Sequence, residues 1–168
     1  MRIGPSYEVS PVNLVTLNGE EIIWSEYIRY LGVSIKAGRA FNCILDNAKR
    51  AFYRSFKAIF GKIGRVASED VVVELVKVKC LPMLLYGVEA CHLKKSQINS
   101  LQYAINCCFK KIFNTSSKDV VLDCMVQFDF PIIECAIAKR TSKFLLRYAD
   151  SGKNNLMFSV FVRTALSS

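Results

Sequence analysis

The chain has 168 residues, with 23 Lys and Arg against 14 Asp and Glu, which gives a net charge of +9. Because 52% of the residues are hydrophobic and 22% are charged, the composition is that of a folded globular protein and excludes wholesale disorder. No apolar run reaches the ~18 residues that a membrane span requires, and the opening residues, MRIGPSYEVS, lack the apolar core of a signal peptide. We therefore expect a soluble, intracellular protein whose basic surplus favours an anionic partner, either nucleic acid or an anionic membrane surface.

Residues 1–37 are predicted to form a small antiparallel sheet. Two β-prone runs in VNLVTLNGEEIIW meet at Asn18-Gly19, and Asn-Gly between such runs is a strong hairpin signal because both residues tolerate positive φ. A third strand is predicted from Tyr27 to Ile35. A sheet of three strands has exposed edges and is hard to stabilise alone, so we expect it to pack on something larger.

The third predicted strand, YIRYLGVSIK, has a glycine at its centre, which is costly inside a strand. Gly32 indicates either a bulge or turn, which needs no function, or the close approach of something large, such as a nucleic-acid backbone, to the main chain. The strand residues alone leave both interpretations open.

Residues 38–150 are predicted to form a helical bundle, because apolar residues recur at spacings of three and four. The first helix begins near residue 40 and ends at Gly61 and Gly64; the second starts at Ser68 and breaks near Cys80, before Pro82. Three more helices are predicted at Ser96–Phe113, Asp119–Gln127 and Pro131–Tyr148, and residues 151–168 form a tail that suits a truncated helix. The predicted fold class is α+β, mostly α: a small amino-terminal antiparallel sheet of about three strands followed by a helical bundle.

The seven cysteines are odd in number, scattered and mostly embedded in apolar segments, which predicts reduced, buried thiols. They are Cys43, Cys80, Cys91, Cys107, Cys108, Cys124 and Cys135. A zinc site would need paired spacings such as C-x2-C, and the chain has none. Cys91-His92 with Cys107-Cys108 is the one candidate cluster, and it is disfavoured because sequence neighbours rarely point the same way. We expect no metal or cofactor in this chain.

The basic surplus is concentrated between Lys36 and Arg65, where eight basic residues face one acid, Asp46. Arg50, Arg54 and Lys57 are spaced four and three apart, so they line one helix face, with Lys49 and Tyr53 beside them. Like charges at that spacing repel one another unless an anion neutralises them, and phosphates would do so. An ordinary solvated face is the alternative, and the near absence of acids favours nucleic acid. The pairs Lys94-Lys95, Lys110-Lys111 and Lys139-Arg140 are interpreted as ordinary surface residues.

The sequence predicts no catalytic site. His92 is the single histidine, no Ser/His/Asp set can be assembled, and no glycine-rich phosphate loop is present. A two-metal nucleotidyl-transfer site would need clustered carboxylates, typically a consecutive Asp pair, and the chain contains no Asp-Asp.

The order of these segments resembles a known family. A β-hairpin, then WSEYIRYLGVSI, the basic stretch AKRAFYRSFKAIFGKIG and VVVELVKVKCLPMLLYGVEAC are similar to the carboxy-terminal part of reverse transcriptases from non-LTR (LINE-type) retrotransposons. The resemblance covers about residues 1–150. It implies that the hairpin and the YLG strand close the palm and form the primer-grip region, and that the following helices are the thumb, which grips the primer–template duplex.

The resemblance also implies nucleic-acid-binding residues. Tyr30, Leu31 and Gly32 would face the primer end. The candidates for contacts to the nucleic-acid backbone are Lys49, Arg50, Arg54 and Lys57. Tyr53, Lys62 and Arg65 complete the set of candidate nucleic-acid-binding residues. The implied partners are an RNA/DNA duplex or hybrid and the palm and fingers of a longer polymerase, with no membrane.

The chain departs from the family in lacking the fingers, most of the palm and the family's metal-binding aspartates. The complete family enzyme would use Mg²⁺, so we expect this chain to be inactive alone, a fragment of an RNA-directed DNA polymerase. Two alternatives stay open. The chain could be a helical protein-interaction module whose charge serves solubility, or an element remnant with no function of its own.

Overall fold

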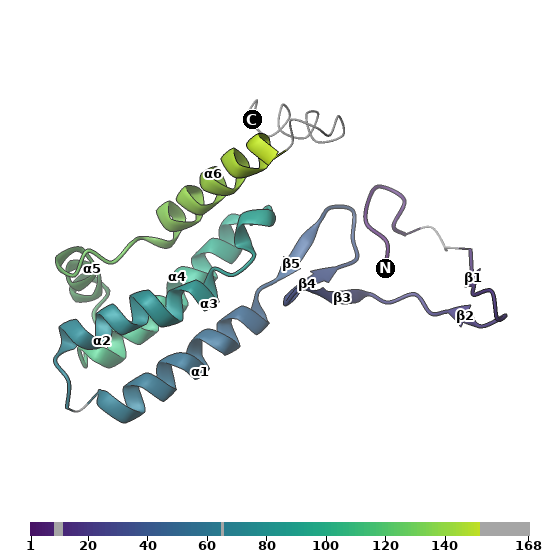
Figure 1. The fold of residues 1–168 in the computed structure, drawn as a ribbon. Helices are drawn as coiled ribbons and strands as arrows, with labels where there is room; N and C mark the ends of the chain where they lie inside the picture. Colours follow the sequence, from purple (N-terminus) through teal and green to yellow (C-terminus); the bar gives the residue numbers. More distant parts are fainter. Residues whose placement is uncertain (9–11, 65, 152–168) are drawn as a thin grey trace.

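A computed structural model describes residues 1–8, 12–64 and 66–151 of the chain. Short strands occupy the amino-terminal part and helices the rest, which confirms the predicted α+β, mostly α fold (Figure 1). The predicted tail lies outside the described residues from residue 152 on.

The Asn18-Gly19 hairpin is confirmed. Strands β1 (Leu14–Val15) and β2 (Glu21–Ile22) pair antiparallel, and the Gly19 N–H donates to the Thr16 carbonyl at 2.9 Å. Of the two turn residues it is Gly19 that takes a positive φ, +81°. This pair forms a sheet of its own, and Figure 1 shows it on an arm that extends away from the helices.

The single strand predicted from Tyr27 to Ile35 is wrong, because that segment is a tight hairpin. Strands β3 (Tyr27–Tyr30) and β4 (Val33–Lys36) pair antiparallel with Tyr30 opposite Val33. Leu31 and Gly32 form the turn, with φ of +46° and +84°, the two successive positive values that a type I′ turn requires. The usual sequence signal for a type I′ turn is Asn-Gly. Here a leucine occupies the first turn position, so the sequence does not carry that signal.

The first helix begins later than predicted, because residues 42–44 extend the sheet. Strand β5 (Asn42–Ile44) pairs antiparallel with β4, with Cys43 opposite Ile35. Helix α1 (Asp46–Ile63) follows after Leu45. The apolar pair Ile44-Leu45 fits a helical stripe as well as a strand, so periodicity alone placed the boundary too early.

The second helical stretch does not break near Cys80 as predicted. It runs as α2 (Glu69–Leu75), a π-helical segment η1 (Val76–Cys80) and α3 (Leu81–Leu84). Pro82 lies in the first turn of α3, where its missing N–H costs little, and the wider π turn before it keeps the chain helical. A 3₁₀ turn, η2 (Val88–Ala90), follows after Gly87.

Three longer helices complete the described chain: α4 (Lys95–Ile112), α5 (Lys118–Gln127) and α6 (Ile133–Ser151). The predicted Ser96 cap is wrong, because Lys94 precedes the helix and its N–H donates to Gln97 Oε1 at 2.9 Å. Ser117 caps α5 by accepting a bond from the Val120 N–H.

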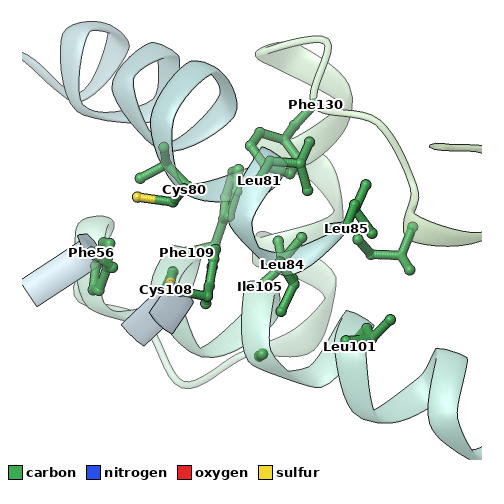
Figure 2. Packing of buried hydrophobic residues seen from close by; sticks show 14 of the residues in the cluster. Phe56, Cys80, Leu81, Leu84, Leu85, Leu101, Ile105, Cys108, Phe109 and Phe130 are labelled. Atoms are coloured by element: carbon green, nitrogen blue, oxygen red, sulfur yellow. The ribbon is translucent and has the colours of Figure 1, made fainter. Parts of the chain in front are cut away.

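The core lies between α1, the α2–α3 stretch, α4 and α5 (Figures 1 and 2). Phe52, Leu101, Ile105 and Phe109 are fully buried, which confirms the predicted apolar stripes of the first and third helices, and Leu84 of α3 is fully buried as well. Burial of each such side chain contributes about 2 kcal/mol relative to leaving it in water. Phe109 also packs edge-on against Phe130, with the ring centroids 5.0 Å apart, and so ties α4 to the segment before α6.

The prediction that all seven cysteines are reduced is wrong for two of them. Cys43 in β5 and Cys91 after η2 form a disulfide across 48 residues of sequence. Sequence spacing gave no sign of the pair, because the sheet and η2 meet only in the folded chain. Among the others, Cys80 and Cys108 are buried as predicted, whereas Cys135 is exposed.

Candidate nucleic-acid interface

The outer face of α1 carries the three basic residues that the sequence placed together. Successive residues of an α-helix are rotated by about 100°, so Arg50, Arg54 and Lys57 lie within one narrow sector. That sector is opposite the side occupied by Phe52 and Phe56, which face the core. All three basic side chains are exposed.

Lys49 and Tyr53 do not join this outer face, because both are held on the side of α1 that meets α4. Lys49 Nζ lies 3.0 Å from Asp46 Oδ1 and donates to Ser100 Oγ at 3.1 Å. Tyr53 is half-buried, and burial, followed by the neighbouring thiols of Cys107 and Cys108, raises its pKa to about 12. Their positions are explained by packing, so the cationic face is smaller than the sequence predicted.

The remaining charge of the basic stretch is mostly unpaired. Arg39 pairs with Glu8, at 3.3 Å between Nη2 and Oε2, and Lys49 pairs with Asp46. Within the part of the chain that the structure describes, no acid lies within ion-pair distance of five others: Lys36, Arg50, Arg54, Lys57 and Lys62. Lys62 is in the last turn of α1, where a cation is favoured by the helix dipole without any ligand. Arg65 lies outside the described residues.

The three YLG residues form the tip of the β3–β4 hairpin. Tyr30 and Leu31 are exposed, Leu31 at 72%. Gly32 has two local reasons to be glycine: its φ is +84°, and a Cβ there would lie 3.3 Å from Tyr86 Cε1. Gly87, at φ +73°, has a stronger reason to be glycine, because a Cβ added there would lie 2.4 Å from Val33 Cγ2. Of the two interpretations of Gly32, the structure supports the turn, and the close neighbour is this chain's own Tyr86-Gly87 segment.

A cleft of about 440 Å³ connects the hairpin tip with the beginning of α1. Gly32 and Arg29 line it from the hairpin, Asn47 and Ala51 from α1, and Tyr86 from the segment after α3. The sequence prediction missed Arg29. Alternation along β3 would have found it, because Arg29 points to the face opposite to Ile28 and Tyr30.

The arrangement is suited to binding anions. Arginine guanidinium groups donate in a planar fork that matches two phosphate oxygens, and an outer helix face can follow a backbone of phosphates without reading its bases. No three His, Cys, Asp or Glu side chains of the described chain gather in a group that could hold a metal ion. Among the described residues no helix is long and apolar enough to cross a membrane.

No protein-family model, no curated protein and no solved structure matches this chain.

Proposed function

We propose that the chain binds nucleic-acid duplex, RNA/DNA hybrid included, through phosphate contacts of the outer face of α1, as the thumb-like part of a reverse transcriptase of the non-LTR type. The observation that carries this proposal is the set of exposed cations Arg50, Arg54 and Lys57, which have no acid partner among the described residues. Three like charges side by side on one helix weaken that helix by a few tenths of a kcal/mol per pair, roughly, unless an anion offsets them.

The tip of the β3–β4 hairpin supports the proposal of nucleic-acid binding. Leu31 combines an exposed apolar side chain with a positive φ, which costs a leucine of order 1–3 kcal/mol. Most of the leucine side chain stays in water, at 72% exposure, so packing offsets little of this cost. An exposed and strained residue is typical of a contact site, and the residue after Leu31, Gly32, lines the cleft that leads to α1.

The test is a binding titration of a labelled RNA/DNA hybrid with the wild-type chain and with the triple variant Arg50→Glu, Arg54→Glu, Lys57→Glu. We expect the triple variant to lose at least about tenfold in affinity at low salt, because phosphate contacts dominate sequence-independent binding. A matched control changes three exposed lysines elsewhere to Glu: Lys94, Lys111 and Lys118. Equal affinities of wild type and triple variant would contradict the proposal, and so would an equal loss in the control.

We further propose that the chain alone does not polymerise, because it lacks the consecutive aspartates that hold two metal ions in the family. Primer extension on an RNA template with Mg²⁺ and deoxynucleotides should give no product above a heat-denatured sample. Incorporation that scales with protein concentration and persists after repeated purification would contradict this part of the proposal.

A second candidate function is favoured by the amino-terminal strands, whose apolar residues are largely exposed. Leu14, Val15, Ile22 and Ile28 of these strands are exposed, and so are Val12, Leu17, Ile23 and Leu31 in the segments that flank them. Exposed apolar residues in this number are typical of protein interfaces, and here they would receive the rest of a palm or another protein. A chain that forms a stable oligomer and binds no hybrid at moderate salt would favour this protein-interaction function.

A further inference from the structure

A second group of cations lies on α6, far along the chain from the basic stretch. Lys139, Lys143 and Arg147 follow one another at spacings of four, and Arg140 lies beside them. Like charges at this spacing repel one another, and in the described part of the chain no acid pairs with any of the four. From the sequence alone, Lys139-Arg140 is interpreted as an ordinary surface pair, because the sequence does not reveal what α6 packs against.

These cations line one cleft. It has a volume of about 710 Å³ and lies between α6 and the helical stretch that ends in η2, with Leu81, Leu85 and Ala136 among its apolar lining residues. Lys77 reaches the cleft from η1, where its Nζ donates to the Asp129 carbonyl at 2.9 Å and lies 3.8 Å from Asp129 Oδ2. The cleft has two acids in its lining: Asp129 is engaged by Lys77, and Glu89 forms no ion pair with the four cations of α6 among the described residues.

Glu89 gives the cleft a polar group that needs a donor. Its Oε2 atom is buried and has no hydrogen-bond partner, although the side chain lines the cleft. A buried acceptor without a donor is costly, so a ligand that supplies a hydroxyl or amino hydrogen at this point would gain affinity. A simple anion supplies no such hydrogen, whereas a nucleotide carries both phosphate oxygens and ribose or base donors.

An aromatic ring borders the same cleft. Phe144 is 38% exposed and stacks on Tyr148, with the ring centroids 5.8 Å apart and the planes at 27°. Every base has a flat face that can stack on such a ring, and a basic groove with an aromatic wall is how single strands are held without sequence preference. A cleft of this volume accommodates a small ligand, whereas a duplex cannot enter it.

We propose that the cleft between α6 and the η1–η2 segment binds single-stranded nucleic acid. The cations of α6 hold the phosphates, Phe144 stacks on a base, and Glu89 accepts a hydrogen bond from a ribose hydroxyl or a base amino group. This site is separate from the outer face of α1 in both its residues and its ligand, so it stands or fails independently of duplex binding.

The experiment compares one labelled strand, free and annealed to its complement, in binding titrations with four forms of the full chain. The α6 variant, Lys143→Glu with Arg147→Glu, should bind the single strand at least about tenfold more weakly and the duplex almost unchanged. The α1 triple variant should show the opposite pattern. The control, Lys111→Glu with Lys118→Glu, changes the same charge and should leave both affinities within about twofold of wild type.

Phe144→Leu separates stacking from charge. It should lower affinity for the single strand about tenfold at constant salt dependence, because base stacking, and not a phosphate contact, is lost. Circular dichroism melting checks that each variant is folded, and Lys143→Gln with Arg147→Gln replaces the charge-reversed pair if that pair unfolds.

Three outcomes would overturn the proposal: unchanged single-strand binding in the α6 variant, an equal loss for single strand and duplex, or displacement of the strand by polyglutamate as effectively as by unlabelled strand. The last outcome would assign the cleft to an acidic peptide instead.

Discussion

At particular positions of this chain, the residue type that fits depends on backbone conformation and on close contacts, and composition reveals neither. Gly32 lies against Tyr86, and Gly87 lies against Val33, where the β3–β4 hairpin meets the segment after α3. The sequence identified Gly32 as unusual, but the reason became clear only with Tyr86 beside it.

Gly87→Ala should lower the free energy of unfolding by about 2 kcal/mol or more. The new Cβ would have to push Val33 Cγ2 away from 2.4 Å, and φ of +73° disfavours any L side chain. The control is Gly61→Ala on α1, where the added Cβ meets open space and a better helix former should raise stability by up to about 1 kcal/mol. Urea denaturation of both variants measures the difference, and equal stabilities would show that the hairpin does not dock on Gly87.

The position of Tyr53 predicts that the stability of the fold depends on pH in the alkaline range. Its pKa is raised from 10.0 to about 12 by burial first and then by the thiols of Cys107 and Cys108. The folded chain therefore holds this proton more tightly than the unfolded chain, so its contribution to stability is complete below pH 10 and is lost as the pH rises toward 12.

The check is the urea midpoint at neutral pH and at several points from pH 10 upward, for wild type and Tyr53→Phe. The phenylalanine variant should lose less stability over this range than wild type. Parallel curves for the two proteins would contradict the buried position of Tyr53 against α4.

At the scale of elements, the helices and the Asn18-Gly19 hairpin were predictable, whereas the pairing of β3, β4 and β5 was not. Stripes such as Phe52-Phe56 and Leu101-Ile105 repeat every three or four residues, so α1 and α4 could be recognised from the sequence with errors only at their ends. The β3–β4 turn was missed because Leu31 occupies a conformation typical of asparagine or glycine. The π segment Val76–Cys80 was missed because a proline ordinarily predicts a break.

The Cys43–Cys91 disulfide joins strand β5 to the chain after η2, and it predicts how many cysteines of the unreduced chain can be alkylated. Alkylation of the denatured, unreduced chain should add five groups, at the free cysteines Cys80, Cys107, Cys108, Cys124 and Cys135. In the native state Cys135 should react first because it is exposed, whereas burial raises the pKa of Cys80 and Cys108 and slows them.

The double variant Cys43→Ser with Cys91→Ser should unfold more easily by up to about 4 kcal/mol, the loop-entropy figure for a closed loop of this length. The wild-type chain in excess reductant is the control and should match the variant. Seven alkylated cysteines in the unreduced wild type would contradict the cross-link.

At the scale of the whole molecule, the unpaired basic residues lie on two separate surfaces. Helix α1 presents Arg50, Arg54 and Lys57 on an open face, whereas α6 directs its cations into a cleft. The first could be predicted because helical spacing and the absence of acids are visible in the sequence. The second could not, since it depends on α6 packing against η2 and on the buried Oε2 atom of Glu89.

The most direct test of the central claim is the salt dependence of duplex binding. For phosphate contacts the logarithm of the affinity falls linearly with the logarithm of salt concentration, by about 0.9 per contact. We predict that the triple variant Arg50→Glu, Arg54→Glu, Lys57→Glu makes this slope shallower by about 2.7, because three phosphate contacts are lost. The control variant at Lys94, Lys111 and Lys118 should keep the wild-type slope. A slope unchanged in the α1 variant would contradict the assignment of α1 as the nucleic-acid-binding face.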